Sequence, residues 1–430
     1  MIFNLLIGFF AIFAIAVLYF KYCRAGNRDF LLPVVAYLAL MAAQALGGSI
    51  LIIQSRHLVI PSMLIGLMLR RRELLQENKT KFFWLVSLMF WMPVIATCWA
   101  QSSGIMRGIE LPNSFKCFLC ILAGYVFASA RDFKKLLLLL LPTAVYLVIV
   151  ARTGAIDIGD DGRLSINEVN QNGVGVMAGF AAFIFFANII YGDYPKAVKI
   201  CLWPMLGITV WMTGASGSRS AIAATVGCLG CCSLRYFTSR KHMAYGLGLI
   251  VLGFIVLSIV LYHMPKEVVG RMFDYSNYSG RETAWENVRY DIGHYNPLIG
   301  TGGSYWIDMY GNFKWRGFLN IYYDFYNTCG LLGVFLGCIF FFSFVAKAWT
   351  MWRKLGSDLK YPILGMCMFG FLHGVGEDSP IRYGNVSGFL FQIGLGLFAG
   401  LSLRKRQRYV MDEPLKRPQI WIPHHENRNM

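Results

Sequence analysis

The sequence predicts an all-α protein that crosses a membrane about twelve or thirteen times. Hydrophobic residues make up 56% of its 430 residues, charged residues make up only 15%, and long apolar runs recur along the whole chain. An ordinary soluble domain has roughly 25% charged residues. Because a helix needs about 20 apolar residues to cross the hydrocarbon core of a bilayer, these runs are typical of a polytopic membrane protein.

The apolar runs place the expected spans along the chain. They lie at 2–20, 30–48, 52–69, 83–100, 115–130, 136–151, 173–191, 199–213, 220–237, 244–262, 321–346, 361–376 and 386–403. The second and third share a stretch interrupted by Gly47, Gly48 and the polar segment 54–57, so the total stays open between twelve and thirteen. Such broken segments can also re-enter the membrane from one side.

Basic segments set the expected orientation, because Lys and Arg accumulate in cytoplasmic loops. One side receives the basic segments 70–81, 131–135, 235–241 and 347–360 and the tail from Arg404. The opposite, periplasmic side receives the segments 101–114, 152–172, 214–219, 263–320 and 376–385. We therefore expect one integral membrane domain over 1–403, with a long periplasmic loop at about 263–320, and a basic cytoplasmic tail over 404–430.

The formal net charge of +17 does not by itself indicate nucleic acid, because the basic residues are dispersed among short segments between apolar runs. We interpret them as topology signals and expect no nucleic-acid partner. The eleven cysteines lie almost entirely in or beside apolar runs, where small packing residues are common. Cys117 and Cys120 have the spacing of a metal motif but no partner pair, so we expect neither a metal nor a disulfide framework.

Polar clusters on the periplasmic side are the candidates for a functional site, because an ionisable group there needs water, a partner or a ligand. The first cluster runs from Thr213 to Ala221 and places Arg219 among small residues at a helix start. Guanidinium donors and the amides of a helix N-terminus would together bind an anion such as phosphate. The alternative is an arginine that only anchors its helix at the membrane interface.

The second cluster lies in the long loop and combines Arg281 with the turn-forming segment 296–303. A structural cap with a salt-bridged arginine explains it equally well. The third cluster opens the span at 321–346, where Asn320 and Tyr322 could hydrogen-bond sugar hydroxyls. Tyr322 also fits the aromatic belt of an ordinary membrane helix.

The fourth cluster opens the span at 173–191. It brings Arg163 together with the amide side chains of Asn167, Asn170, Gln171 and Asn172. An arginine and several amides at the mouth of a helix suit a sugar or a diphosphate, although Asn172 could be no more than a helix N-cap.

Taken in order, the clusters resemble the O-antigen ligase and polymerase (Wzy) superfamily of bacterial membrane glycosyltransferases, over about residues 160–380. The shared pattern is an amide-rich helix entry, Ser218-Arg219, Gly280-Arg281 with Trp285, Asn296-Pro297-Leu298-Ile299-Gly300-x-Gly302, and the helix entry 319–323 before Gly330 and Gly333. The resemblance implies a GT-C-like helical fold in the bacterial inner membrane.

The resemblance also implies polymerisation of undecaprenyl-diphosphate-linked oligosaccharide repeat units at the periplasmic face. Arg219 and Arg281 match the paired arginines of the family, which would hold the diphosphate and neutralise charge on the leaving group. Such a transfer needs no metal or cofactor. The other expected partners are membrane lipids and, as a candidate, a polysaccharide chain-length regulator.

The residues expected to bind the substrate are Arg163, Asn172, Asn320 and Tyr322. The family pattern has a histidine where this sequence has Leu319, and a leucine cannot orient or deprotonate an acceptor hydroxyl. This difference weakens the alternative of a ligase that transfers glycan to lipid A core.

A different proton acceptor is then expected. His373 and Glu377 are four residues apart, which places them on one face of a helix near the end of a span. A buried structural pair that closes the helix end is the alternative. His294 is a further candidate, although a solvated loop histidine is the simpler interpretation.

A lipid-linked glycan flippase and a structural membrane protein are the other function classes. Flippases usually show two related halves and no long outer segment, whereas this sequence predicts one long insertion. A structural protein would not need arginines at three outer helix ends.

The orientation can be tested at Ser304, in the middle of the long expected loop. We expect a cysteine at this position, in a variant without the native cysteines, to react with a membrane-impermeant thiol reagent in intact spheroplasts. A reaction that requires opening of the inner membrane would reverse the orientation.

Overall fold

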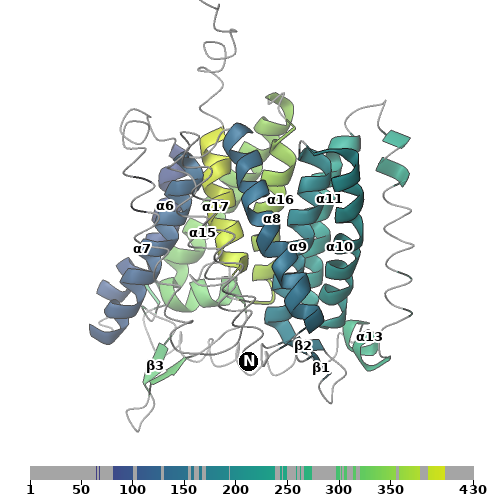
Figure 1. Cartoon of the computed structure of the whole chain (residues 1–430). Coiled ribbons are helices and arrows are strands. Elements are labelled where there is room, and N and C mark those ends of the chain that lie inside the picture. Colours follow the sequence, from purple (N-terminus) through teal and green to yellow (C-terminus); the bar gives the residue numbers. More distant parts are fainter. Residues whose placement is uncertain are drawn as a thin grey trace, which may run out of the picture.

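The computed structural model describes residues 64, 67, 81–99, 104–126, 130–153, 156–158, 164–166, 171–192, 194–237, 243–244, 246–248, 258, 262, 266–273, 297–300, 302, 305–307, 313–315, 320–354, 358–377 and 386–401. These residues form a helical bundle with two short β-hairpins (Figure 1). The expected spans at 2–20 and 30–48, most of those at 52–69 and 244–262, and the tail 404–430 lie outside the described residues.

The helices are α6 (Lys81–Trp99), α7 (Gly104–Val126), α8 (Ala130–Thr153), α9 (Gln171–Tyr191), α10 (Lys196–Ala215), α11 (Arg219–Phe237), α13 (Lys266–Phe273), α15 (Ile321–Lys354), α16 (Lys360–Gly374) and α17 (Val386–Leu401). The antiparallel hairpins are β1 (Ile156–Ile158) with β2 (Leu164–Ile166), and β3 (Tyr305–Ile307) with β4 (Phe313–Trp315). Apart from these three-residue strands, the elements in the described residues are helical, as predicted.

Five helices in the described part of the chain are long and apolar enough to cross a membrane: α6, α9, α10, α11 and α15. This finding indicates a membrane protein. Helix α9 is the central one, because 83% of its apolar stretch is buried inside the protein. The buried share of the apolar stretch is 28% in α11 and 28% in α15. Helices α8, α10, α11 and α17 contact α9, which explains why it is apolar on all sides.

Several helices extend beyond the expected spans, and the corresponding loop predictions were wrong. Helix α7 begins at Gly104 and α8 begins at Ala130, so most of 101–114 and all of 131–135 are helical. Helix α15 continues to Lys354, well into the expected loop at 347–360. The cause is that an apolar run marks the part of a helix that needs an apolar environment, whereas backbone hydrogen bonding continues into its polar ends.

Small residues allow close helix crossings. A Cβ atom on Gly124 of α7 would overlap the carbonyl oxygen of Ile393 on α17. At the crossing of α11 and α16, a Cβ atom on Gly365 would lie 2.9 Å from the carbonyl oxygen of Cys228 and 3.3 Å from Sγ of Cys232. Both cysteines are fully buried, so they pack at this crossing as small residues do in membrane bundles.

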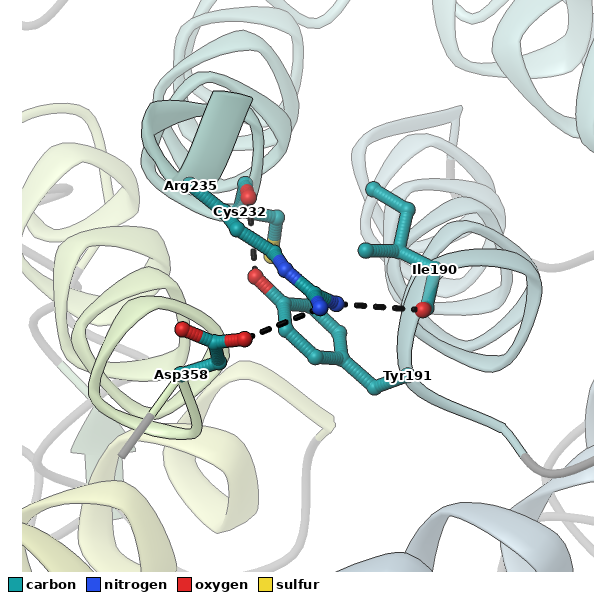
Figure 2. Close-up of polar contacts among 5 residues, drawn as sticks. All are labelled: Ile190, Tyr191, Cys232, Arg235 and Asp358. Carbon is teal, nitrogen blue, oxygen red and sulfur yellow. Dashed lines mark hydrogen bonds and ion pairs between the residues drawn. The ribbon is translucent and has the colours of Figure 1, made fainter. Parts of the chain in front are cut away.

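One end of the bundle is held together by Arg235, as Figure 2 shows. Its guanidinium pairs with Asp358 at 2.9 Å, donates to the carbonyl of Ile190 at 3.5 Å and lies over the ring of Tyr191, 5.4 Å from the centroid. The Tyr191 hydroxyl in turn donates to the carbonyl of Cys232 at 3.0 Å. These contacts join α9, α11 and the turn before α16, and we call this the Arg235 end of the bundle.

Helix α15 is broken at Gly330, whose φ of 61° and ψ of −159° are not helical. A turn from the long expected loop fills the break: the amides of Leu331 and Leu332 donate to the carbonyls of Pro297 and Leu298, at 2.9 and 3.1 Å. The amide of Gly302 donates to the carbonyl of Thr328 at 3.0 Å. The backbone groups freed by the kink are therefore paired, as an apolar environment requires.

Only glycine fits at position 330. A Cβ atom there would lie 2.5 Å from the amide nitrogen of Gly300, and the backbone region that Gly330 occupies is essentially restricted to glycine. The segment 297–302 and helix α15 thus meet through their backbones.

We expect Gly330→Ala to lower the free energy of unfolding by about 2 kcal/mol or more, because strain and overlap add. Thermal unfolding of the purified protein in detergent measures the change. Gly337→Ala on the same helix is the matched control, since a Cβ atom there would meet nothing within 4 Å. Equal unfolding temperatures for the two variants would contradict the docking of the turn against the kink.

Candidate functional site

The helix ends that sequence analysis singled out and the structure describes lie at the end of the bundle opposite Arg235. Helices α9, α11 and α15 begin there, and α10 and α16 end there (Figure 1). We call it the Asn172 end, after the residue that links two of these segments.

The turn between α10 and α11 presents Arg219. Gly217, with φ of 62°, reverses the chain, and its amide donates to the carbonyl of Gly214 at 2.8 Å. The hydroxyl of Ser216 donates to the carbonyl of Thr213 at 2.7 Å and accepts the amide of Ser218 at 3.3 Å. Helix α11 then begins at Arg219.

Arg219 is therefore the first residue of a helix, as predicted, and it is partly exposed. The first amides of a helix have no partner within that helix and carry the positive end of its dipole. A guanidinium at this position adds a full positive charge and a fork of donors, and both features favour a phosphate group.

The start of α9 packs directly against this turn. A Cβ atom on Gly175 would overlap Oγ of Ser216 and lie 3.1 Å from Cβ of Ser218. The two backbones approach closely because neither has a large side chain between them. Asn172 precedes Gly175 by about one helical turn, so it lies at the same end of the bundle as Arg219.

Asn172 forms the link to α16. Its side-chain amide donates to Oε1 of Glu377 at 2.9 Å, between residues 205 positions apart in the sequence. The N-cap alternative for Asn172 was wrong, because α9 already begins at Gln171. The hydrogen bond instead places an amide and a partly exposed carboxylate side by side, a combination that can bind sugar hydroxyls.

The sequence pattern predicted that His373 and Glu377 lie on one helix. The structure shows that they do not share one continuous helix. Helix α16 ends at Gly374, and the amide of Gly376 donates to the carbonyl of His373 at 3.1 Å in a tighter turn. His373 is buried at 1% exposure and stacks on Phe369 with 6.3 Å between ring centroids. Its predicted role in proton transfer stays a prediction.

Asn320 begins α15 and ties it to α16. Its side-chain oxygen accepts the amides of Tyr322 and Tyr323, at 2.8 and 3.2 Å, so Asn320 is the N-cap of the helix. Its side-chain nitrogen donates to the carbonyl of Val375 at 2.8 Å. The oxygen is committed to backbone amides, which leaves only the second N–H for a ligand.

Tyr322 is 51% exposed at the start of α15, where a ligand could reach its hydroxyl. Its predicted contact with substrate stays a prediction. Arg163, Arg281 and His294 lie outside the described residues. In the part of the chain that the structure describes, no group of three or more His, Cys, Asp and Glu side chains is arranged to hold a metal ion.

Sequence analysis missed Asp324. This carboxylate lies one turn into α15 and has only 3% exposure, and Asn327 and Thr328 on the next turn have the same low exposure. The available signal was an aspartate inside a long apolar stretch, because an ionisable residue within a membrane span is rare and commonly functional. The tyrosines around Asp324 are also typical of the aromatic belt of an ordinary membrane helix, so the pattern did not single out this carboxylate.

Comparisons with models of protein families, with curated proteins and with solved structures found no match.

We expect Glu377→Ala and Asn172→Ala each to destabilise the protein, with a coupling energy between them of about 1 kcal/mol, as for a single hydrogen bond. A double-mutant cycle on unfolding in detergent measures this energy. Glu377→Gln is the control, because its side-chain oxygen can still accept from Asn172. Fully additive effects of the two alanine substitutions would mean that the hydrogen bond does not join α9 to α16.

Proposed function

We propose that this protein polymerises undecaprenyl-diphosphate-linked oligosaccharide repeat units at the periplasmic face of the bacterial inner membrane. The products would be O-antigen, capsule or exopolysaccharide chains. The protein would be a metal-independent glycosyltransferase whose donor is a lipid-linked glycan.

The observation that carries the proposal is that a helix start with an arginine and a hydrogen-bonded amide–carboxylate pair lie at the same end of an apolar bundle. Arg219 opens α11 on one side of the α9 start, and the Asn172–Glu377 hydrogen bond lies on the same end. A lipid diphosphate has its phosphates at the membrane surface, beside its sugar. Such a substrate needs adjacent sites for phosphate and sugar at the end of a membrane bundle.

In the proposed reaction, an acceptor sugar hydroxyl attacks the anomeric carbon of the donor. The bond from that carbon to the diphosphate oxygen breaks, and its electron pair leaves with undecaprenyl diphosphate. Arg219 and Arg281 would neutralise the negative charge that develops on the leaving oxygen, a contribution that is large when the donors are already in place. The acceptor proton passes to a nearby base.

The sugar contacts are assigned to Arg163, Asn172, Asn320 and Tyr322, and Asn172 is the best supported of them. Its hydrogen bond to Glu377 fixes the orientation of its side-chain amide beside a carboxylate. A pre-set orientation lowers the entropy lost when a substrate binds.

Transfer of the glycan to lipid A core by a ligase is the alternative. It is less favoured because Leu319 replaces the histidine of the ligase pattern. Glycans from cells that lack this protein separate the two: single repeat units on lipid A core indicate a lost polymerase, and polymer left on undecaprenyl diphosphate indicates a lost ligase.

We expect Arg219→Ala and Arg281→Ala each to abolish polymer formation while the protein remains in the membrane. Lysine at either position should restore little, because it lacks the bidentate fork of arginine. The measurement is the length distribution of polymer formed by purified variants from the lipid-linked repeat unit.

Lys196→Ala is the control for loss of a positive charge, since Lys196 is exposed at the start of α10, at the Arg235 end of the bundle. It should leave the length distribution unchanged. Normal polymer from Arg219→Ala at matched expression would remove the diphosphate role of this residue.

A further inference from the structure

Helix α11 exposes one side along much of its length, and Arg219 stands at the start of that side. The exposed residues of α11 are Ala223, Val226 and Gly230, and Val226 is 64% exposed. They follow Arg219 by four, seven and eleven residues, which places all four on one side of a helix with 3.6 residues per turn. The remaining sides hold the buried residues Ser220, Ala221, Ala224, Thr225, Cys228 and Cys232. Arg219 therefore belongs to the outward side of α11. We call residues 223, 226 and 230 the outer strip.

The outer strip is suited to contact with lipid chains. Helix α11 is long and apolar enough to cross a membrane, and only 28% of its apolar stretch is buried. The side chains of the strip carry no polar atom, and a Cβ atom on Gly230 would meet nothing within 4 Å. A molecule that approaches Arg219 along this strip therefore comes sideways out of the membrane.

The length of the outer strip matches the depth of one leaflet. With a rise of about 1.5 Å per residue, Arg219 and Gly230 are about 17 Å apart along the helix axis, close to half of a hydrocarbon core of about 30 Å. Leu234 and Phe237 continue the same side toward the Arg235 end, but they are only partly exposed. The strip thus runs from the Asn172 end to about the middle of the membrane.

The position of the positive charge distinguishes α11 from the other exposed helices. Helices α10 and α15 also expose apolar side chains, such as Ile208 and Leu332, each at 43%. Their basic residues nearest to the Asn172 end are Lys199 and Lys347, and both lie in the half of the helix toward the Arg235 end. Among α10, α11 and α15, only α11 joins an exposed apolar strip to a positive charge at the Asn172 end. This combination complements a lipid with an anionic head group.

We propose that the polyprenyl chain of the lipid-linked substrate lies along the outer strip, so that its diphosphate reaches Arg219 sideways from the membrane. The inference rests on the proposed function, which assigns the diphosphate to Arg219 but leaves the path of the lipid open. The small side chains of the strip let a methyl-branched chain lie close to the helix. Dispersion contacts between the two then add up over the length of the strip.

Photochemical cross-linking tests the position of the lipid chain without turnover. The full-length protein carries Val226→p-benzoylphenylalanine and is placed in nanodiscs of phosphatidylethanolamine and phosphatidylglycerol, with radiolabelled undecaprenyl diphosphate as the probe. We expect at least about tenfold more labelling than with the same substitution at Ile208 on α10, as for a charge-assisted contact that holds the head group. Arg219→Ala should lower the labelling at Val226 to the level at Ile208.

Equal labelling at Val226 and Ile208 would overturn the proposal, because it would mean that α11 contacts membrane lipids without preference. Unlabelled undecaprenyl diphosphate should compete with the probe. Equal competition by added phosphatidylglycerol would also overturn the proposal, since the strip would then bind phospholipids in general.

A matched pair of glycine substitutions tests the effect on turnover. Gly230→Phe places a ring on the outer strip, and we expect the KM for the undecaprenyl-linked repeat unit to rise about tenfold with kcat changed less than about twofold, because the chain contributes uniform binding. With the same repeat unit on geranyl diphosphate, whose chain is too short to reach Gly230, the KM should not change. Gly207→Phe is the control and should keep the wild-type KM, since Gly207 is also exposed and a Cβ atom there would meet nothing within 4 Å.

An unchanged KM in Gly230→Phe would overturn the proposal, and so would an equal increase with the geranyl substrate. If Gly230→Phe does not fold, as judged from its unfolding temperature, the labelling at Val226 decides the question. The proposed function fails separately, when the wild-type protein does not lengthen the repeat unit. A wild-type protein that polymerises but gives equal labelling at Val226 and Ile208 loses only the proposed lipid path.

Discussion

Every backbone N–H and C=O group inside an apolar bundle must have a hydrogen-bond partner, and this constraint governs how the site is built. A continuous helix meets it alone, but α15 is broken at Gly330. The partners of its freed groups come from the turn at 297–302. The kink therefore ties a segment of the long expected loop to the bundle, and it fixes the helix start that carries Asn320 and Asp324.

The candidate site is held by a few directional contacts between segments that are distant in the sequence. Asn172 joins α9 to Glu377, and Asn320 joins the start of α15 to Val375. The α10–α11 turn is placed by the close approach of Gly175 to Ser216. Hydrogen bonds from amide side chains define direction as well as distance, so these contacts orient the polar groups at the Asn172 end of the bundle.

The two ends of the bundle differ in a way that bears on function. At the Arg235 end, the guanidinium is used within the protein by Asp358, Ile190 and Tyr191 (Figure 2). This arrangement ties helices together. At the Asn172 end, Arg219 opens α11, and both Arg219 and Glu377 are partly exposed. Under the proposed function, the guanidinium of Arg219 would bind the diphosphate, and the amide–carboxylate pair of Asn172 and Glu377 would bind the sugar.

The sequence by itself determined the features that depend on local composition. The apolar runs predicted the centres of α6, α9, α11 and α17, because helix formation and burial in an apolar medium are both encoded locally. Local signals also placed Arg219 at a helix start. They did not place the polar ends of α7, α8 and α15, because a polar helix end leaves no gap in backbone hydrogen bonding and no apolar pattern.

The tertiary structure alone decided which polar residues meet. No local pattern relates Asn172 to Glu377. The sequence pattern predicted that Asn320 binds substrate, and only the structure shows that its side chain bonds the carbonyl of Val375 and the first amides of α15. Contacts between distant segments depend on how helices cross in three dimensions, and the sequence pattern of a single helix records only which of its faces is apolar.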